Sequence, residues 1–302
     1  MNTVTRRIAC IGAVAALMLA TPACGRLEQL ADPTVVTPAG EGVPPLDVNA
    51  NATALLPGSV TARGVLRVAI PTNEPPTQFY EEGTRYMTGV NPDIARLIGE
   101  ALGLAVEIKV VNFDSIIPGI TAGRYDMTVS SMTPTNTRIA VIDFVDYVQV
   151  GNAIVIAKGQ PRLTQNTLCG KRVGVLIGSY QLTTNIPDYD QTCAASGRPQ
   201  IRTAQFQDTR QAISALTSTR LDAVLADSPI LEFAATQDPD VVIAEKYDYT
   251  PVAVGVTKEP TLVNAVAAAL DTVITSTAYR EVLRKYGLES AMITQARVNA
   301  AQ

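Results

Sequence analysis

The chain contains no histidine among its 302 residues, and acidic residues outnumber basic ones, 28 to 24. Histidine is the commonest general acid–base residue and a frequent zinc ligand, so its absence excludes histidine-based catalysis and most zinc sites. The formal net charge of −4 argues against DNA or RNA as a partner, because phosphate binding needs a basic face. We therefore expect no metal, no cofactor and no nucleic acid.

Long apolar runs are also scarce: beyond the N-terminal segment, none reaches 18 residues. The N-terminal run, from Ile8 to Ala20, follows two arginines and is too short to cross a bilayer as a permanent helix. This pattern is typical of a signal peptide, which we place at residues 1–23. Its removal takes away two arginines and no acid, so the net charge changes from −4 to −6. We expect an exported protein.

The end of this segment, Leu19-Ala20-Thr21-Pro22-Ala23-Cys24, resembles a bacterial lipobox. In such a sequence the cysteine is acylated and becomes the first residue of the mature chain. Thr21 departs from the leucine that usually stands three places before that cysteine. We predict a lipid on Cys24 that anchors the protein to the extracytoplasmic side of the bacterial cell membrane. Plain secretion is the alternative.

Only two cysteines follow Cys24, namely Cys169 and Cys193. An exported chain reaches an oxidising compartment, and these two residues close a loop across one predicted strand and one predicted helix. We predict a disulfide between them, and two separate buried thiols are the alternative. Two ligands without any histidine are too few for a metal site.

Residues 24–58 are rich in proline, alanine, glycine and asparagine and show no sustained hydrophobic period. We predict that this segment is a mostly disordered tether between the lipid and the folded part. Beyond it, short apolar strands alternate with amphipathic helices, first after Gly64 and again after Gly170. The alternation predicts an α/β fold with two lobes, each a parallel sheet covered by helices.

The boundaries of the two lobes follow from the places where the chain crosses between them. We assign residues 59–150 and 251–300 to lobe 1, and residues 151–250 to lobe 2. The extended segments at residues 149–157 and 246–256 are the expected hinge strands. In open α/β sheets a ligand sits beyond the carboxyl ends of the strands, so we expect a binding cleft between the lobes.

The most distinctive motif is the run Met132-Thr133-Pro134-Thr135-Asn136-Thr137-Arg138-Ile139, which follows a strand-like segment that ends in two serines. Hydroxyls and free backbone N–H groups at a strand-to-helix junction, with an arginine one turn later, make a site for a carboxylate. The arginine offers a two-pronged, charge-assisted bond. The alternative is a capped surface helix whose arginine lies in solvent.

Five segments stand in a fixed order along the chain: Gly89-Val90-Asn91-Pro92-Asp93, Asn112-Phe113-Asp114-Ser115-Ile116, the run from Thr133 to Arg138, Gly170-Lys171-Arg172-Val173-Gly174, and Asp222-Ala223-Val224-Leu225-Ala226-Asp227. In this order and spacing they resemble the family 3 solute-binding proteins, which are the amino-acid receptors of ABC importers. The resemblance extends from about Gly64 to Leu288. It implies a type II periplasmic-binding-protein-like fold, with two α/β lobes joined by two hinge strands.

The resemblance also implies which residues bind the head group of an amino acid. Arg138 would bind the α-carboxylate, with Thr133 offering its N–H and hydroxyl and Ser179 closing from the second lobe. Ser131 would offer its carbonyl to the α-ammonium, and Asp227 would pair with that cation. For Asp227 the alternative is a simple cap of the helix that follows it.

Other candidate residues surround the position of the ligand side chain. The resemblance implies that Phe113 packs on that side chain and that Gln181 lines the site. Asn73 stands where many family members have an acid, and Glu74 is the neighbouring acid. An inward-facing Glu74 favours a basic ligand, whereas an outward-facing one leaves Asn73, Gln181 and Ser130 as a neutral polar pocket. Plain core for Phe113, and solvated positions for Gln181 and Glu74, are the alternatives.

These inferences predict a lipid-anchored receptor that binds a polar or basic L-amino acid and delivers it to an ABC permease. We expect a monomer that is not an enzyme. A module that reports ligand occupancy to a signalling partner is a second possibility. An enzyme on the same fold, such as a cyclohexadienyl dehydratase, is a third, and it would need a positioned acid in the cleft. Fold alone does not separate these functions.

Overall fold

The computed structural model describes Val35–Val36 and residues 42–300 of the chain. The predicted signal peptide at residues 1–23 and the predicted lipid site at Cys24 lie outside the described residues, as does most of the predicted tether. All statements below concern the described part of the chain.

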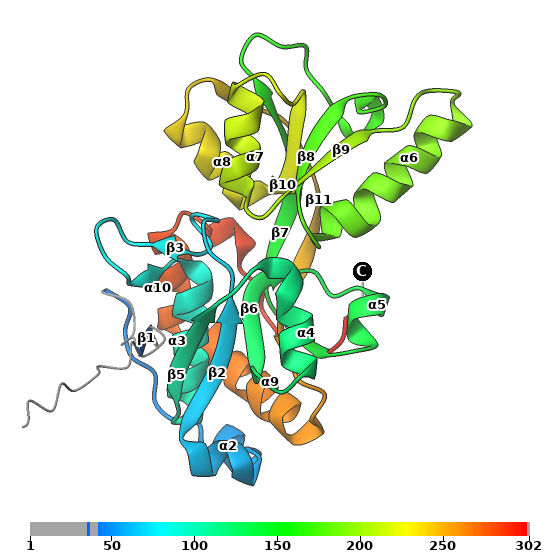
Figure 1. Cartoon of the computed structure of the whole chain (residues 1–302). Coiled ribbons are helices and arrows are strands. Elements are labelled where there is room, and N and C mark those ends of the chain that lie inside the picture. The colour runs from blue at the N-terminus through cyan, green and yellow to red at the C-terminus, as the bar shows by residue number, and fades with distance from the viewer. Residues whose placement is uncertain (1–34, 37–41, 301–302) are drawn as a thin grey trace, which may run out of the picture. The chain divides into compact units, whose positions relative to one another are not determined.

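Nine of the strands in this part form one sheet, in the order β1-β5-β2-β6-β11-β7-β10-β8-β9 (Figure 1). Their bounds are β1 Val35–Val36, β2 Val65–Ile70, β5 Ala105–Val110, β6 Met127–Met132, β7 Asp143–Ala157, β8 Arg172–Leu176, β9 Arg202–Phe206, β10 Ala223–Asp227 and β11 Val241–Val256. A separate ribbon pairs β3 (Phe79–Tyr80) with β4 (Met87–Thr88).

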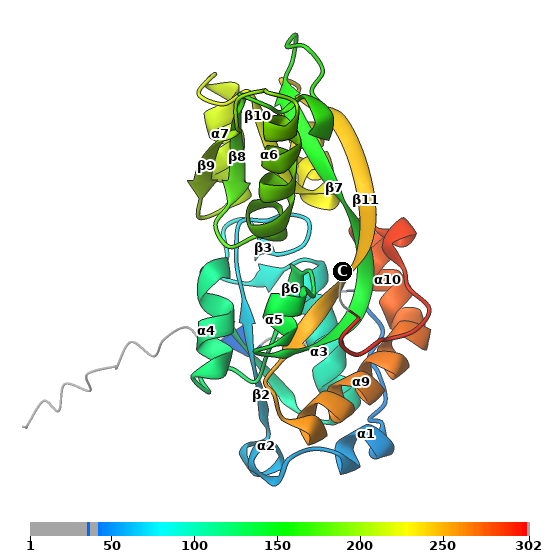
Figure 2. The same ribbon diagram turned by 90° about the vertical axis from the view of Figure 1, so that its right-hand side faces the viewer.

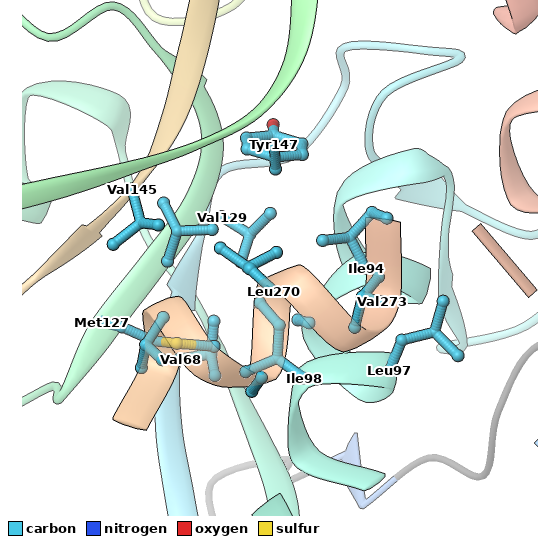
Figure 3. Packing of buried hydrophobic residues seen from close by; sticks show 14 of the residues in the cluster. Val68, Ile94, Leu97, Ile98, Met127, Val129, Val145, Tyr147, Leu270 and Val273 are labelled. Atoms are coloured by element: carbon cyan, nitrogen blue, oxygen red, sulfur yellow. The ribbon is translucent and has the colours of Figure 1, made fainter. Parts of the chain in front are cut away.

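Lobe 1 is built on the parallel strands β2, β5 and β6, which are covered by helices on both faces. The helices of this lobe are α2 Gly58–Arg63, α3 Val90–Leu102, α4 Ile116–Thr121, α5 Asn136–Ile139, α9 Pro260–Thr275 and α10 Thr277–Lys285. Figure 3 shows Ile94 and Ile98 of α3 beside Leu270 and Val273 of α9, on the face of the sheet that carries Val68. A spacing of four residues places these apolar side chains of α3 on one stripe of the helix.

Lobe 2 repeats this arrangement with the parallel strands β8, β9 and β10. Its helices are α6 Ile186–Ala195, α7 Thr209–Thr217 and α8 Ser228–Gln237. Helix α6 packs on one face of the sheet, and α7 and α8 pack on the other. The predicted disulfide is present: Cys169 and Cys193 are bonded, with their Cα atoms 5.6 Å apart. It ties α6 to the segment before β8.

Strands β7 and β11 run from one lobe to the other as an antiparallel pair (Figure 2). Val150 of β7 belongs to the core of lobe 1, whereas Ala153 belongs to a core of lobe 2. The pairing is interrupted between Tyr247 and Thr250, where Asp248 has a φ of 47°. These two strands are the two connections expected of the predicted fold class. Lobe 1 is taken below as residues 59–150 and 251–300, and lobe 2 as residues 151–250.

The prediction that residues 24–58 are mostly disordered is wrong for the described end of that segment. Helix α1 (Ala50–Ala54) lies within it, and the Asn49 side chain caps this helix. Ala52 is fully buried, and the Asn49 amide donates to the hydroxyl of Thr272 in α9 at 2.8 Å. A helix of five residues shows no sustained period in a sequence, and it is stabilised here by its cap and by packing rather than by propensity.

No single helix in the described ranges is long and apolar enough to cross a membrane. Helices α9 and α10 meet that test only when they are taken together, and they are bent by 75° at their junction.

One glycine fixes the loop that leads from β2 toward the interlobe region. Gly89 has a φ of 121°, and a Cβ atom there would lie 2.5 Å from the carbonyl oxygen of Thr77. The nearby Asn91 N–H donates to that same oxygen at 2.8 Å. Only glycine allows this close approach. The contact holds the loop that carries Glu74 and Gln78 against the start of α3.

Candidate functional site

A cavity lies where loops of lobe 1 and lobe 2 meet. Its walls come from the carboxyl ends of strands in both lobes, as expected for an α/β sheet. The lining residues are Glu74, Gln78, Phe113, Ser130, Ser131, Thr133, Arg138, Leu176, Ser179, Tyr180, Gln181, Thr209, Ala226, Asp227 and Ile230. Nine of the ten ligand-binding residues predicted from the sequence are among them, and Asn73 is not.

Arg138 extends from the short helix α5 into this cavity. The Thr135 hydroxyl caps α5 by accepting from the Arg138 N–H, so the predicted cap exists, but the guanidinium does not lie in solvent. It donates to the carbonyl oxygens of Thr133 and Gly178, each at 2.8 Å. The Phe113 ring lies 5.8 Å from the guanidinium carbon.

The charge of Arg138 is not neutralised by any carboxylate within ion-pair distance in the described part of the chain. Burial lowers the pKa of its guanidinium to about 10, and the charge of Asp227 opposes this shift. A desolvated guanidinium that is held only by neutral carbonyls stabilises an incoming carboxylate strongly, because the charge-assisted bond forms where little water competes.

Asp227 supplies the opposite charge from lobe 2. It stands at the N-cap position of α8, yet its side chain makes no capping hydrogen bond. Its Oδ1 instead accepts from the Gln181 amide at 2.7 Å, and the same amide nitrogen donates to Asn152 at 2.9 Å. Burial raises the pKa of Asp227 to about 6, against the effects of the Gln181 hydrogen bond and the Arg138 charge. The carboxylate therefore faces the cavity rather than its own helix.

Glu74 brings a second carboxylate to the cavity, from the loop after β2. It is 2% exposed, and its Oε1 accepts from the Thr209 N–H at 2.7 Å, in the first turn of α7 in lobe 2. Its Oε2 is buried without a hydrogen-bond partner. Burial raises the pKa of Glu74 to about 8, with the Thr209 bond opposing the shift and Asp208 and Asp227 adding to it. The side chain thus points inward.

Three predicted hydroxyl residues end β6 or follow it, at the wall formed by lobe 1. Ser130 accepts from the Thr128 hydroxyl at 2.9 Å, and Thr133 uses its carbonyl to hold Arg138. Ser131 has a φ of 52°, in the left-handed region. Its N–H donates to the Tyr147 hydroxyl at 3.0 Å. The structure thus brings all three residues to the cavity, each held in a different way.

From lobe 2, Ser179 and Gln181 complete the set. Ser179 is buried, and its hydroxyl accepts from the Leu182 N–H at 3.2 Å, so this hydroxyl can still donate to a ligand. Gln181 is 4% exposed and orients Asp227, which excludes the solvated helix position considered for it. The arrangement offers an isolated cation, two carboxylates and several hydroxyls. Among the described residues no group of three or more metal-ligating side chains gathers.

Comparison with known proteins agrees with this geometry. Residues 66–289 match the family described as bacterial extracellular solute-binding proteins, family 3. The chain belongs to this family. The fold class predicted from the sequence is confirmed by the solved structures that resemble it.

Two solved structures and one sequence relative illustrate the likeness. The arginine-binding protein ArgT of Corynebacterium glutamicum is 27% identical over 251 residues, which cover 82% of each chain. An ancestral arginine-binding protein bound to arginine has a TM-score of 0.68 at 30% identity, covering 74% of this chain and 98% of that one. The ancestral amino acid-binding protein AncCDT-1, a precursor of cyclohexadienyl dehydratase, has a TM-score of 0.65 at 25% identity, covering 76% and 97%.

Asn73 lies outside the cavity of this solute-binding protein. It has a φ of 63°, and its amide reaches a carboxylate oxygen of Asp208 in lobe 2 at 3.5 Å. The prediction placed Asn73 in the site because it stands where many family members have an acid. At the turn after β2 the left-handed residue directs its side chain toward Asp208 instead, and only Glu74 enters the cavity.

Six residues that line the cavity are not among the predicted ligand-binding residues. They are Gln78, Leu176, Tyr180, Thr209, Ala226 and Ile230. Thr209 follows Asp208, which caps α7, so a capped helix start was visible in the sequence but its distance from Glu74 was not. Gln78 forms an isolated β-bridge with Glu74 in the loop after β2, and no sequence pattern points to it. Tyr180 precedes the π-helical turn Gln181–Asn185, which no periodicity rule anticipates.

Proposed function

We propose that the protein is an extracytoplasmic receptor that binds a basic L-amino acid, arginine foremost, between its lobes and delivers it to an ABC permease. The single observation that carries this proposal is the buried, inward-facing Glu74, whose Oε2 has no partner. A cationic ligand side chain would supply that partner.

A count of charges supports a basic ligand. Arg138 pairs with the α-carboxylate of an amino acid, and Asp227 pairs with its α-ammonium, so these two residues suit every L-amino acid. With both carboxylates ionised, the cavity carries one negative charge in excess, which Glu74 provides. Arginine, lysine or ornithine brings one net positive charge, and the buried charges are then balanced. An acidic ligand would be repelled.

Relatives support the same class of ligand. ArgT is named as an arginine-binding protein, and the ancestral structure of TM-score 0.68 holds arginine. A neutral ligand such as glutamine has no cationic side chain that could pair with Glu74. That ligand would bind with the carboxyl protonated, which a pKa of about 8 allows at neutral pH.

A thermal-shift screen of the protein without its first 24 residues, against the twenty amino acids and ornithine, tests the proposal. A ligand that binds only the native state raises stability by about 2.7 kcal/mol at a concentration 100 times its Kd. We expect the largest shift with arginine, followed by lysine or ornithine. Arg138→Ala is the control, because it should show no shift with any of them. A largest shift with aspartate or glutamate would contradict the proposal.

Transport, sensing and catalysis differ in what happens after binding. Loss of arginine uptake on deletion of the gene supports transport, whereas intact uptake with loss of a transcriptional response supports the sensing alternative. Incubation followed by chromatography separates binding from catalysis, because a receptor returns its ligand unchanged. The likeness to AncCDT-1 favours binding, since that protein is itself an amino acid-binding protein.

We further propose that a lipid on Cys24 anchors the receptor, as a monomer, beside its permease. The lipobox-like sequence before Cys24 supports this proposal. Two or three acyl chains hold a protein firmly on a membrane, whereas one chain holds it weakly. Cys24→Ala should release the protein from the membrane fraction or leave it uncleaved. A variant that is cleaved correctly and still sediments with membranes would argue against the lipid.

A further inference from the structure

Among the described residues that line the cavity, Ser131 is the one whose backbone is held in the left-handed region. Its φ of 52° is unfavourable for a residue with a side chain. Ser131 lies in a bulge: β6 pairs with β11 at Val129 and again at Met132, and the register shifts between these two points. Bulges of this kind redirect groups next to functional sites.

A single buried hydroxyl opposes relaxation of this conformation. The Tyr147 hydroxyl accepts the Ser131 N–H at 3.0 Å and donates to the Asn91 side-chain oxygen at 2.5 Å. Tyr147 is fully buried on the interlobe strand β7, and burial raises the pKa of its hydroxyl, which keeps the proton in place. In Figure 3 its ring stands at the border of the apolar cluster of lobe 1.

Asn91, at the start of α3, completes the network. Its amide nitrogen donates to the Ser131 hydroxyl at 3.1 Å and to the Gln78 side-chain oxygen at 2.5 Å. Asn91 is fully buried, and both hydrogens of its amide are used within the network, as is its side-chain oxygen. Gln78 lines the cavity as Ser131 does. Two cavity residues are therefore fixed by two residues that lie outside the cavity.

We propose that Tyr147 and Asn91 are positioning residues, which set the affinity for the amino-acid head group by holding Ser131 in its left-handed conformation and Gln78 in its orientation, without touching the ligand. The inference rests on the proposed function of the cavity. Without the Tyr147 hydroxyl, Ser131 would relax to a negative φ and turn its backbone groups away from the place they now hold. A buried donor without its partner would add to the cost.

The test is calorimetry of Tyr147→Phe with L-arginine and L-glutamine as probes. We expect Kd to rise about tenfold or more for both probes, with their ratio unchanged, because a lost buried hydrogen bond is worth about that factor. The matched control is Tyr279→Phe. Tyr279 is 1% exposed, and its hydroxyl donates to the Tyr147 carbonyl at 2.8 Å without reaching Ser131. It should lower the melting temperature similarly and change Kd less than about threefold.

A second pair of variants separates positioning from general destabilisation. Glycine adopts a positive φ freely, so in Ser131→Gly the backbone at position 131 no longer depends on the Tyr147 hydroxyl to stay left-handed. In the Ser131→Gly background, Tyr147→Phe should change Kd by less than about threefold, so the two substitutions are not additive. Asn91→Ala should weaken both probes as Tyr147→Phe does, and it serves as an independent variant if Tyr147→Phe does not fold.

The outcomes separate this inference from the function on which it rests. If the wild-type protein binds no amino acid, the proposed function and the positioning role fall together. If the wild type binds and both Tyr147→Phe and Asn91→Ala bind equally well, only the positioning role is refuted. An effect of Tyr147→Phe that is equally large in the wild-type and Ser131→Gly backgrounds would also refute it.

Discussion

Two parts of the cavity recognise charge in different ways. Arg138 of lobe 1 and Asp227 of lobe 2 have only neutral hydrogen-bond partners, so the ligand itself must supply their counter-charges. Glu74 of lobe 1 already holds lobe 2, through the N–H of Thr209 at the start of α7. Both lobe 1 residues already contact lobe 2, since Arg138 donates to the Gly178 carbonyl, and the two parts differ in the charges that they leave for a ligand to balance.

This difference separates what every amino acid shares from what distinguishes one amino acid from another. In the proposed complex the head group meets Arg138 and Asp227, whose burial makes each pair strong. The ligand side chain meets Glu74, whose carboxyl holds a proton in the unliganded protein at neutral pH because its pKa is raised to about 8. Substitutions in the first part should therefore act on all ligands alike, whereas substitutions in the second should act on basic ligands alone.

The largest effect should come from Arg138→Ala. Removing one partner of a buried charge pair typically costs about 3–5 kcal/mol, so binding of arginine and of glutamine should both disappear from calorimetry. Arg138→Lys should also lose most of the affinity, since an ammonium cannot reproduce the planar two-pronged contact. Wild-type affinity in Arg138→Ala would remove this residue from the site.

Asp227→Asn should weaken all amino-acid ligands by a similar or slightly smaller amount, about 2–5 kcal/mol. The amide keeps the shape of the carboxylate and its bond from Gln181, so the loss isolates the charge that meets the α-ammonium. Competition binding with arginine and glutamine measures it. A loss confined to arginine would mean that Asp227 contacts the ligand side chain and not the α-ammonium, which would contradict the division into head-group and side-chain residues.

The disulfide offers a contrast, because it lies in lobe 2 and neither cysteine lines the cavity. Replacing Cys169 and Cys193 together by serine should lower the free energy of unfolding by about 3 kcal/mol, as chain entropy predicts for a loop of this size. Arginine affinity at room temperature should stay within about twofold of wild type, since the head-group contacts are intact. Denaturant unfolding and calorimetry on the same samples check both values.

The affinity for arginine should depend on pH with a defined sign. Below about pH 8 Glu74 carries a proton in the unliganded protein, and a cationic side chain favours its ionised form. Binding therefore releases a proton, and affinity should rise with pH up to about 8, by at most about 1.4 kcal/mol per pH unit.

Below about pH 6 protonation of Asp227 should weaken the binding of arginine and of glutamine alike. Titrations of both ligands from about pH 5.5 to about pH 8.5 measure these slopes; equal slopes for both above about pH 6.5 would contradict the assignment of Glu74.

The sequence was enough to predict that Arg138 and Asp227 line the cavity, but not the geometry around Glu74. Arg138 and Asp227 stand in motifs whose local structure fixes their position, a strand end followed by a helix start. Glu74 follows a strand too, but whether it turns inward depends on the left-handed Asn73 beside it and on Thr209, 135 residues later. Helix α1 was missed for a similar reason, since a five-residue helix depends on contacts with distant α9.

The central claim, that Glu74 makes the cavity selective for a basic side chain, is tested most directly by calorimetry of wild type and Glu74→Gln with arginine and glutamine in one buffer at about pH 8. The amide keeps the size of the side chain and removes its charge. We predict that Glu74→Gln weakens arginine by about 2–5 kcal/mol and changes glutamine by less than about 1 kcal/mol. Equal small changes for both ligands, or tight glutamate binding by the wild type, would contradict the claim.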